Sequence, residues 1–502
     1  MLILSILVSL PALNGSPILG ALEVRLAGQA LPIPPDSELR GLLYRLSIDD
    51  RTEQAISLAE LIPPLADAWR VEAWQTGNGR TDSATKSVLW SAGDLAERLD
   101  RFWLIEKPGG TWGVVFDGKT LDGVGRIDVT GEHTEERPPE IWVSWEGVKE
   151  LKKEIDRWSR LTGVKAKTVD VPDVRTKLLS VQRGGGRMPD LVMIQSDDLP
   201  ALTAAATLQA LDGMDSSSLV DKGRNAFNLK GRNWALPFYF DAQLVFYNPK
   251  LLSTPPAKNW DLARLEAESR RIVRTGRTPL AWNAYSAYWI LPFALGFGKQ
   301  AIEDADGMVR PDDMGTRSAL AWLLRMRDEG LMAVLERDAM IGRFASGETA
   351  MILTGSYSIP EFERIGIPFG IAAYPTVPET GKPVAPFLDF KGLAITRSSR
   401  SPLTVRRLAS YLTGPGVQQR FTSSVSKLPA NHEAWELVRT TNAYFPQLER
   451  SYEIGVTVPA TEAYSTYKNI MWKILRFVFA GSMTIDEALG EARRLIEANL
   501  KQ

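Results

Sequence analysis

The sequence predicts an α/β protein with parallel strands and helices on both faces, preceded by a small β-rich domain. After about residue 140, short apolar strands alternate with helices, a pattern that requires parallel strands. Before residue 135, short alternating runs are separated by Gly, Pro, Asn and Asp turns, which indicates antiparallel strands. A chain of 502 residues also exceeds what one core sustains, so two to four domains are expected.

Residues 1–21 form a possible signal or apolar leader. Residues 1–13 are an apolar run of secretory length, shorter than the roughly 20 residues that span a bilayer. No Lys or Arg precedes this run, so a buried first strand of the following domain is the alternative.

Residues 22–135 are predicted to form a β-rich accessory domain with one or two helical insertions, for example over residues 91–98. Three aromatic-rich runs, residues 69–74, 102–107 and 111–116, are predicted to be strands. The polar, Pro-ended segment 131–139 is typical of a linker.

From residue 140 onward, strands and helices follow one another with short turns. The predicted strands cover residues 141–144, 164–171 and 190–194, and the predicted helices cover residues 148–161 and 173–183. Three glycines at 184–186 end the second helix. Near the end of the chain, Thr484 and Glu487 form a capping box that starts the last helix.

Composition excludes several classes of function. The 59 basic and 60 acidic residues nearly cancel, so the chain has no global field for nucleic acid, and no nucleic-acid partner is expected. His133 and His432 are the only histidines and cysteine is absent. This argues against a multi-histidine metal site, a histidine triad and thiolate chemistry, so neither a metal nor a cofactor is expected.

The most informative stretch is residues 231–250, GRNWALPFYFDAQLVFYNPK. A turn, a strand, the acid Asp241, a second strand and a Tyr-Asn turn follow one another in it. Further motifs occur in a fixed order around it: LTGV (161–164), GRMPD (186–190), PPAKNWD (255–261), FASGETAM (344–351) and TGSY (354–357). Over residues 140–500 this order resembles the extracellular solute-binding proteins that serve ABC importers, especially the sugar-binding, maltodextrin type.

The resemblance implies a two-lobe periplasmic-binding-protein-like fold (type II), with hinge crossovers and a ligand between the lobes. It places one lobe at residues 140–240 plus about 385–440, and the other at residues 241–384 plus about 441–502. It also implies a non-catalytic protein that delivers its solute to the membrane permease subunits of an ABC importer. Such a protein is expected in the periplasm or outside the cell, as a monomer, and without a lipid anchor because cysteine is absent.

Polar and aromatic residues follow the predicted strands, and loops at the carboxyl ends of parallel strands are where ligands bind. The candidate ligand-binding residues are Trp145, Glu146, Asp197, Asp198, Asp241, Trp282, Asn283, Tyr285, Tyr288, Tyr357 and Asp389. Asp241 is the strongest candidate, because an acid inside an apolar strand is costly unless it has a partner. Tyr357 is supported by its family position alone.

Structural alternatives stay open for several of these residues. One of Asp197 and Asp198 is expected to cap the helix that begins near Leu199, and Asp197 is the better ligand candidate. Trp145, Trp282 and Tyr285 are also compatible with a place in the core. Asp389 either contacts the ligand or ties the return crossover at the hinge.

Aromatic rings combined with acids and an amide suit a sugar, because its C–H faces lie against rings while its hydroxyls donate to carboxylates. A polyamine or another small polar solute would use the same groups through ion pairs and cation–π contacts. A sensory module and a glycosidase with a carboxylate pair are further alternatives. Maltodextrin itself is disfavoured by three departures from the family pattern: Ile194 and Lys468 replace aromatic residues, and Asp198 replaces a basic one.

Overall fold

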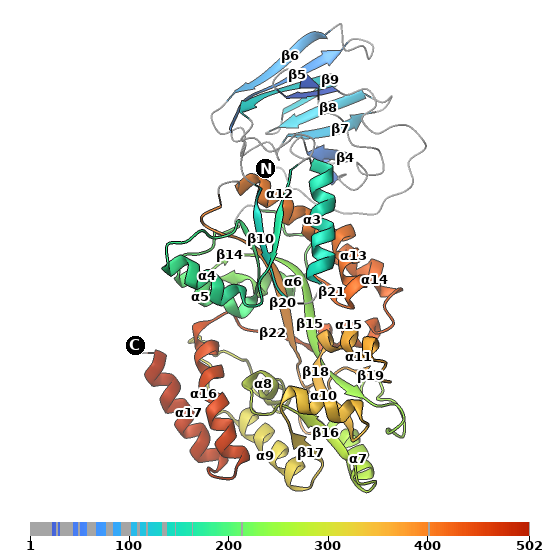
Figure 1. Cartoon of the computed structure of the whole chain (residues 1–502), viewed down its shortest axis with the longest axis vertical. Coiled ribbons are helices and arrows are strands. Elements are labelled where there is room, and N and C mark those ends of the chain that lie inside the picture. The colour runs from blue at the N-terminus through green and yellow to red at the C-terminus, as the bar shows by residue number, and fades with distance from the viewer. Residues whose placement is uncertain are drawn as a thin grey trace. The chain divides into compact units, whose positions relative to one another are not determined.

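The structure is a computed structural model, and its elements are labelled in Figure 1. It describes residues 23–26, 29–30, 44–48, 51–57, 67–76, 84–91, 102–107, 111–116, 119–132, 138–145, 147–162, 164–211, 214–399 and 402–500. The chain divides into two compact units. Unit 1 is Met1–Val192, Gly213–Ser218 and Ile395–Val417, and unit 2 is Met193–Asp212, Leu219–Ala394 and Gln418–Gln502.

The first part of unit 1 is a nine-stranded sheet, which confirms the β-rich character predicted for this region. The strands are β1 (Glu23–Leu26), β2 (Gln29–Ala30), β3 (Tyr44–Ile48), β4 (Arg51–Ser57), β5 (Asp67–Thr76), β6 (Ala84–Ser91), β7 (Trp103–Lys107), β8 (Thr111–Phe116) and β9 (Lys119–Glu132). Neighbouring strands are antiparallel except β1 and β9, which run parallel. The predicted helical insertion after Ser91 and the middle of the predicted linker, residues 133–137, lie outside the described residues.

The α/β part of unit 1 has the predicted alternation of strands and helices. Its elements are β10 (Glu140–Val143), α3 (Val148–Thr162), β11 (Lys167–Asp170), α4 (Val174–Arg183), the start of β12 (Leu191–Gln195) and α12 (Pro402–Thr413). β10 pairs in parallel with both β11 and β12, as predicted. The Asp173 side chain caps α4 by accepting the N–H of Thr176, and the helix ends at Gly184, so the glycine triplet acts as a terminator.

Unit 2 is built on a mixed sheet with the strand order β12-β20-β15-β18-β16-β17. Its other strands are β13 (Asn228–Leu229), β14 (Arg232–Asn233), β15 (Leu236–Tyr247), β16 (Thr278–Trp282), β17 (Met332–Val334), β18 (Thr349–Gly355), β19 (Gly370–Ala372), β20 (Phe387–Ile395), β21 (Leu428–Pro429) and β22 (Val456–Thr457). β16 runs parallel to β17 and β18, whereas β15 is antiparallel to β18 and β20.

Helices connect these strands. They are α5 (Leu199–Ala204), α6 (Asp221–Ala226), α7 (Leu262–Val273), α8 (Ala287–Gly296), α9 (Met314–Asp328), α10 (Arg337–Ala345), α11 (Ile359–Ile365), α13 (Pro415–Val425), α14 (His432–Arg439), α15 (Phe445–Ile454), α16 (Glu462–Phe479) and α17 (Ile485–Leu500), with 3₁₀ turns η4 (Ser196–Asp198) and η5 (Ser356–Ser358). The predicted capping box of α17 is confirmed, because Glu487 and Thr484 exchange backbone and side-chain hydrogen bonds. Within the described ranges, no helix combines the length and the apolar character needed to cross a membrane.

The crossover segment differs from the sequence prediction in one respect. Two strands were expected on either side of Asp241, but β15 is continuous over its 12 residues. It changes partners instead: residues up to Ala242 pair with β20, and residues from Gln243 pair with β18. Asp241 therefore lies next to the point at which β15 passes from one set of neighbours to the other.

Candidate functional site

The centre of the candidate site is a cross-strand pair of acids in unit 2. β15 and β20, which run side by side in Figure 1, are in a register that sets Asp241 directly opposite Asp389. Directly opposed residues project from the same face of a sheet, and like charges in that arrangement are destabilising. Both acids are predicted site residues, and their juxtaposition requires compensating charges.

Lys427 compensates Asp241. Its Nζ donates to both carboxylate oxygens of Asp241, at 2.9 and 3.1 Å, and the Ser356 hydroxyl donates to Oδ1 at 2.7 Å. Both charged side chains are buried, at 3% exposure for Asp241 and 0% for Lys427. Burial alone would raise the pKa of Asp241, but the charges of Lys427 and Lys391 and the Ser356 hydrogen bond outweigh it and lower that pKa.

Lys391 compensates Asp389. It lies two residues further along β20, on the same face, and its Nζ donates to Asp389 Oδ2 at 2.6 Å. Gln195 Nε2 donates to the same oxygen at 3.1 Å. Burial nevertheless raises the pKa of Asp389, since Lys391 offsets it only in part and the Asp197 and Asp241 charges oppose a further anion.

The third pair involves Asp197, one of two neighbouring acids whose roles the sequence left open. Lys468 on α16 donates to Asp197 Oδ2 at 2.8 Å, and both side chains are partly exposed. Asp198 instead accepts the N–H of Gln195 at 3.1 Å and so caps the η4 turn that precedes α5. The Asp198 side chain makes no cap hydrogen bond to α5, so the predicted cap of that helix is not observed, and the ligand role of Asp197 stays a prediction. The three pairs, which we call the Asp–Lys cluster, are Asp241–Lys427, Asp389–Lys391 and Asp197–Lys468.

Aromatic rings border the Asp–Lys cluster. Tyr288 stacks on Phe387 with ring centroids 5.2 Å apart, and Tyr464 meets the same ring edge-on at 6.0 Å. Lys427 Nζ lies 5.9 Å from the centroid of the Tyr357 ring. Burial, together with the nearby Asp197 and Asp389 charges, raises the pKa of Tyr464 well above its usual value. Its buried hydroxyl therefore remains a donor, and it has no hydrogen-bond partner among the described residues.

Three other predicted site residues of unit 2, Trp282, Asn283 and Tyr285, make contacts with residues outside the Asp–Lys cluster. Trp282 is fully buried and stacks on Phe293 with centroids 5.3 Å apart. Asn283 donates to Glu336 at 2.7 Å, and its side-chain oxygen accepts the N–H of Tyr285. A ligand role for these residues stays a prediction.

Trp145 belongs to unit 1 and follows β10, as expected. Its backbone has φ 65°, a left-handed conformation that is uncommon for a bulky residue and that often marks functional sites. Glu146 lies outside the described residues.

Two lysines of the cluster were missed by the sequence reading. Lys391 had a readable signal, because it stands two residues from Asp389 in a strand and therefore shares its face. Lys427 had none, because it is 186 residues from Asp241 in sequence. Lys468 was noted only as a replacement for an aromatic residue. Within the described residues, no group of three or more His, Asp or Glu side chains could hold a metal ion.

Comparisons with known proteins agree on one class of protein. The family model for bacterial extracellular solute-binding proteins matches residues 148–443. The maltodextrin-binding protein MdxE of Bacillus subtilis is 21% identical over 331 residues, which cover 63% of this chain and 79% of that protein. A maltooligosaccharide ABC transporter solute-binding lipoprotein of Streptococcus pneumoniae is 24% identical over 381 residues, which cover 71% of this chain and 88% of that protein.

Solved structures show the same fold. The maltose/maltodextrin-binding domain MalE of Bdellovibrio bacteriovorus, bound to maltotriose, superposes with a TM-score of 0.63 at 22% identity, covering 73% of this chain and 100% of that one. The maltotriose-binding protein of Thermus thermophilus, also bound to maltotriose, gives 0.63 at 19% identity and covers 72% of this chain and 100% of its own. At such identities the likeness concerns the fold, and it confirms the fold class predicted from the sequence.

Proposed function

Because the chain belongs to the family of bacterial extracellular solute-binding proteins, as its crossover motif predicted, we propose that it captures a neutral carbohydrate and delivers it to an ABC importer. The family assignment carries the extracellular solute-binding role. The identity of the solute rests on the chemistry of the Asp–Lys cluster. One observation carries the proposal: the three acids of the Asp–Lys cluster are each already paired with a lysine.

The charges of the cluster favour a neutral ligand. Three carboxylates and three ammonium groups sum to zero, so a cation would be opposed by the lysines and an anion by the acids. A sugar brings no charge. Its hydroxyls can donate to the partly exposed carboxylates of Asp197 and Asp389 and accept from the Lys468 ammonium group. Hydrogen bonds to charged groups contribute about 1.5–3 kcal/mol each, so three of them with one stacked ring suffice for micromolar affinity.

The relatives support the same class of ligand. The proteins from Bacillus subtilis and Streptococcus pneumoniae are named for binding maltodextrin and maltooligosaccharide. The departures at Ile194 and Lys468 alter two positions at which that branch has aromatic rings, so a different neutral sugar is the better proposal for this chain. The partners would be the permease subunits of the importer, and the place of action the periplasm or the cell exterior.

The proposed lobes meet along β15. The boundary between residues 240 and 241 falls beside the point at which β15 changes partners after Ala242, which supports a hinge there. A monomer with one such hinge needs no second subunit for ligand capture.

A glycosidase is the second candidate, because one observation favours it. Asp241 and Asp389 are adjacent carboxyls whose environments move their pKa values in opposite directions, a pattern that acid–base pairs show. The geometry opposes it. Both Asp241 oxygens accept from Lys427, and the 3% exposure of that side chain leaves no path to an anomeric carbon. We therefore propose a binding protein that releases its sugar unaltered.

Differential scanning fluorimetry with neutral mono- and oligosaccharides, sugar acids and spermidine tests this proposal. A ligand at 100 times its dissociation constant stabilises the folded state by about 2.7 kcal/mol and raises the melting temperature. Neutral sugars should produce the shift and spermidine should not. A response to spermidine alone would contradict the proposal, and mass spectrometry that found shortened sugars would favour the glycosidase.

A further inference from the structure

A short segment of the first proposed lobe lies against helix α16 of the second. The segment is residues 195–198, which are the end of β12 and the η4 turn. In sequence it belongs to the proposed lobe of residues 140–240, and its strand begins in unit 1. The boundary between the compact units falls between Val192 and Met193, so the segment itself is in the same unit as α16. Its contacts therefore join parts of the chain that the proposed hinge would move relative to each other.

Two contacts join this segment to the second proposed lobe, residues 241–384 and 441–502. Asp197 Oδ2 accepts from Lys468 Nζ on α16 at 2.8 Å. Beside it, the Ser196 hydroxyl donates to the carbonyl of Val458, in the chain that leads into α16, at 3.3 Å. Only the first contact is an ion pair, so its sign can be reversed by substitution and its strength altered by salt.

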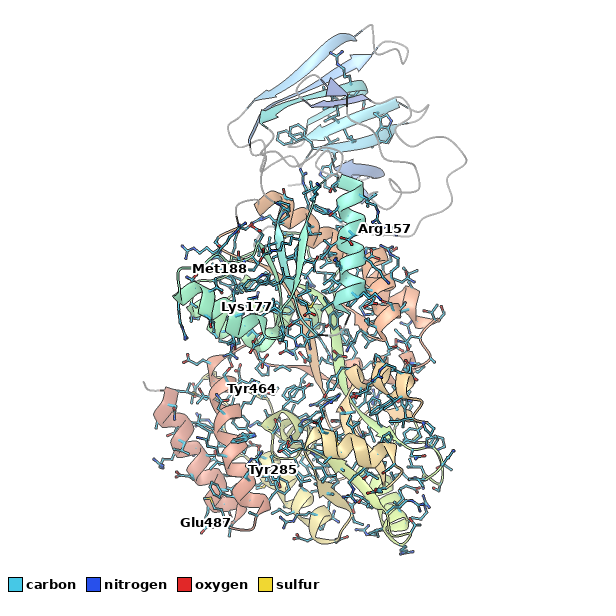
Figure 2. All side chains as sticks on the ribbon, viewed as in Figure 1. Arg157, Lys177, Met188, Tyr285, Tyr464 and Glu487 are labelled. Atoms are coloured by element: carbon cyan, nitrogen blue, oxygen red, sulfur yellow. The ribbon has the colours of Figure 1, made fainter. Side chains whose placement is uncertain are left out.

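A neighbouring ring restrains Lys468. Its Nζ lies 5.8 Å from the centroid of the Tyr464 ring, one turn earlier on α16, and Figure 2 labels that tyrosine. An ammonium group within about 6 Å of a ring centroid is attracted to the ring face. An ammonium that its own helix already orders loses less conformational freedom when it forms an ion pair. Lys468 is therefore better prepared to hold Asp197 than a free surface lysine would be.

A second ion pair of unit 2 matches this one but lies within a single proposed lobe. Asp312 pairs with Arg493 at 3.0 Å, and both residues belong to the second proposed lobe. The Asp312 side chain is 21% exposed and the Asp197 side chain is 20% exposed. The two acids thus differ in what they connect rather than in their contact with water. Asp312 is the matched control for Asp197.

We propose that Asp197 and Lys468 form a clasp that holds the two proposed lobes closed before any solute binds. This inference rests on the proposed function, because it needs two lobes that hinge. An ion pair between lobes forms only where the lobes are close, so it stabilises the closed state alone and shifts the equilibrium towards it. The bond uses one carboxylate oxygen and one of three ammonium protons, which leaves the remaining positions for a solute.

The clasp strengthens solute binding by positioning the lobes. The apparent dissociation constant is the intrinsic one divided by the closed fraction, so a larger closed fraction tightens binding. An ion pair with this exposure to water changes the ratio of closed to open molecules by up to about fivefold. The effect should weaken in salt, because both charges are partly exposed and are screened.

Double electron–electron resonance on the full chain without sugar tests the clasp. The sequence contains no cysteine, so Ala204→Cys on α5 and Lys473→Cys on α16 provide the two labelling sites, one in each proposed lobe. Both residues are exposed, and α5 directly follows the η4 turn. In dilute buffer the labelled chain should show a short-distance population, which corresponds to the closed state.

Three variants in this labelled background separate charge from other effects. Asp197→Lys replaces attraction by repulsion and should lower the ratio of short to long distances by at least about fivefold. The charge-reversed double variant, Asp197→Lys with Lys468→Asp, should restore the ratio. Asp312→Lys should match the unsubstituted chain, because it breaks a pair within one lobe. Raising NaCl from about 0.05 M to 1 M should shift the unsubstituted chain towards the long distance.

Several results would overturn the clasp. They are a long distance alone in the unsubstituted chain, a ratio that Asp197→Lys leaves unchanged, and a double variant as open as Asp197→Lys. If Asp197→Lys does not fold, the salt series decides, and a distribution that salt does not change rejects the proposal. No sugar is present in these measurements. The clasp can therefore fail while neutral sugars still raise the melting temperature, and the carbohydrate proposal can fail while the clasp stands.

Discussion

Two pairs of the Asp–Lys cluster have the same chemistry and differ in their exposure to water. Asp241 and Lys427 are 3% and 0% exposed, whereas Asp197 and Lys468 are 20% and 35% exposed. Removing one member of a buried pair leaves a charge in a low dielectric, while a pair near water is screened and contributes about 0–1 kcal/mol. We infer that the buried pair supports the junction of β15 and that the exposed pair exchanges its bonds with a ligand.

Asp241→Ala breaks the buried pair and should have the largest effect on the free energy of unfolding. It leaves the Lys427 ammonium buried without the Asp241 carboxylate, which should cost about 3–5 kcal/mol. Urea denaturation monitored by tryptophan fluorescence measures this change. The variant is therefore unsuited to test ligand contact, although the sequence alone makes Asp241 the most attractive choice.

The double variant Asp241→Ala with Lys427→Met controls for the buried Lys427 ammonium that has lost the Asp241 carboxylate. If the loss arises from the stranded ammonium, replacing it by an apolar side chain should recover most of the stability. Asp338→Ala is the reference for an acid that matters little, because the Asp338 side chain is 99% exposed. A loss in Asp241→Ala no larger than in Asp338→Ala would show that the buried Asp241–Lys427 pair does not stabilise the fold.

Asp197→Ala breaks the exposed pair and should separate binding from stability. The free energy of unfolding should fall by less than about 1 kcal/mol, because the pair is partly screened. Sugar affinity should fall by about ten- to a hundredfold, the equivalent of one hydrogen bond to a charged group at 1.5–3 kcal/mol. Calorimetric titration measures the affinity, and unchanged binding would remove Asp197 from the site.

The sequence predicted the acids better than their partners, for a physical reason. Asp241 could be predicted as a site residue because an acid between apolar strand residues must be paired or functional, whichever residue its partner is. Lys427 could not be predicted as the partner from the sequence. It reaches Asp241 because the chain turns at Ser426, which has φ 51°, and enters β21, which pairs with Tyr239 and Phe240 of β15. Long-range pairing of this kind leaves no mark on local sequence.

Local signals served well and site assignments less so. The glycine stop after α4 and the capping box of α17 depend on residues a few positions apart, and both appear in the structure. Trp282 shows the limit: its position at the end of β16 is compatible with a ligand contact, but it stacks on Phe293, eleven residues on in α8, and is completely buried. Burial depends on what covers a residue, and the sequence around it does not say.

The pH dependence of stability compares the two acids of the cross-strand pair, Asp241 and Asp389. We expect the smallest effect here, because their contributions to stability change with pH in opposite directions. The pKa of Asp241 is lowered by its lysines, so its stabilising contribution is present above pH 4 and is lost as the pH falls through the lowered value. The pKa of Asp389 is raised by burial, so its contribution is present below about pH 4 and is lost as the pH rises through the raised value.

Melting temperatures measured from pH 3 to pH 7 test this difference. On acidification, the melting temperature of Asp241→Asn should fall less than that of the wild type. In Asp389→Asn the decline on raising the pH from 4 should be smaller than in the wild type. Asp338→Asn should follow the wild type across the range. Identical profiles for Asp241→Asn and Asp389→Asn would mean that the two acids have equivalent environments.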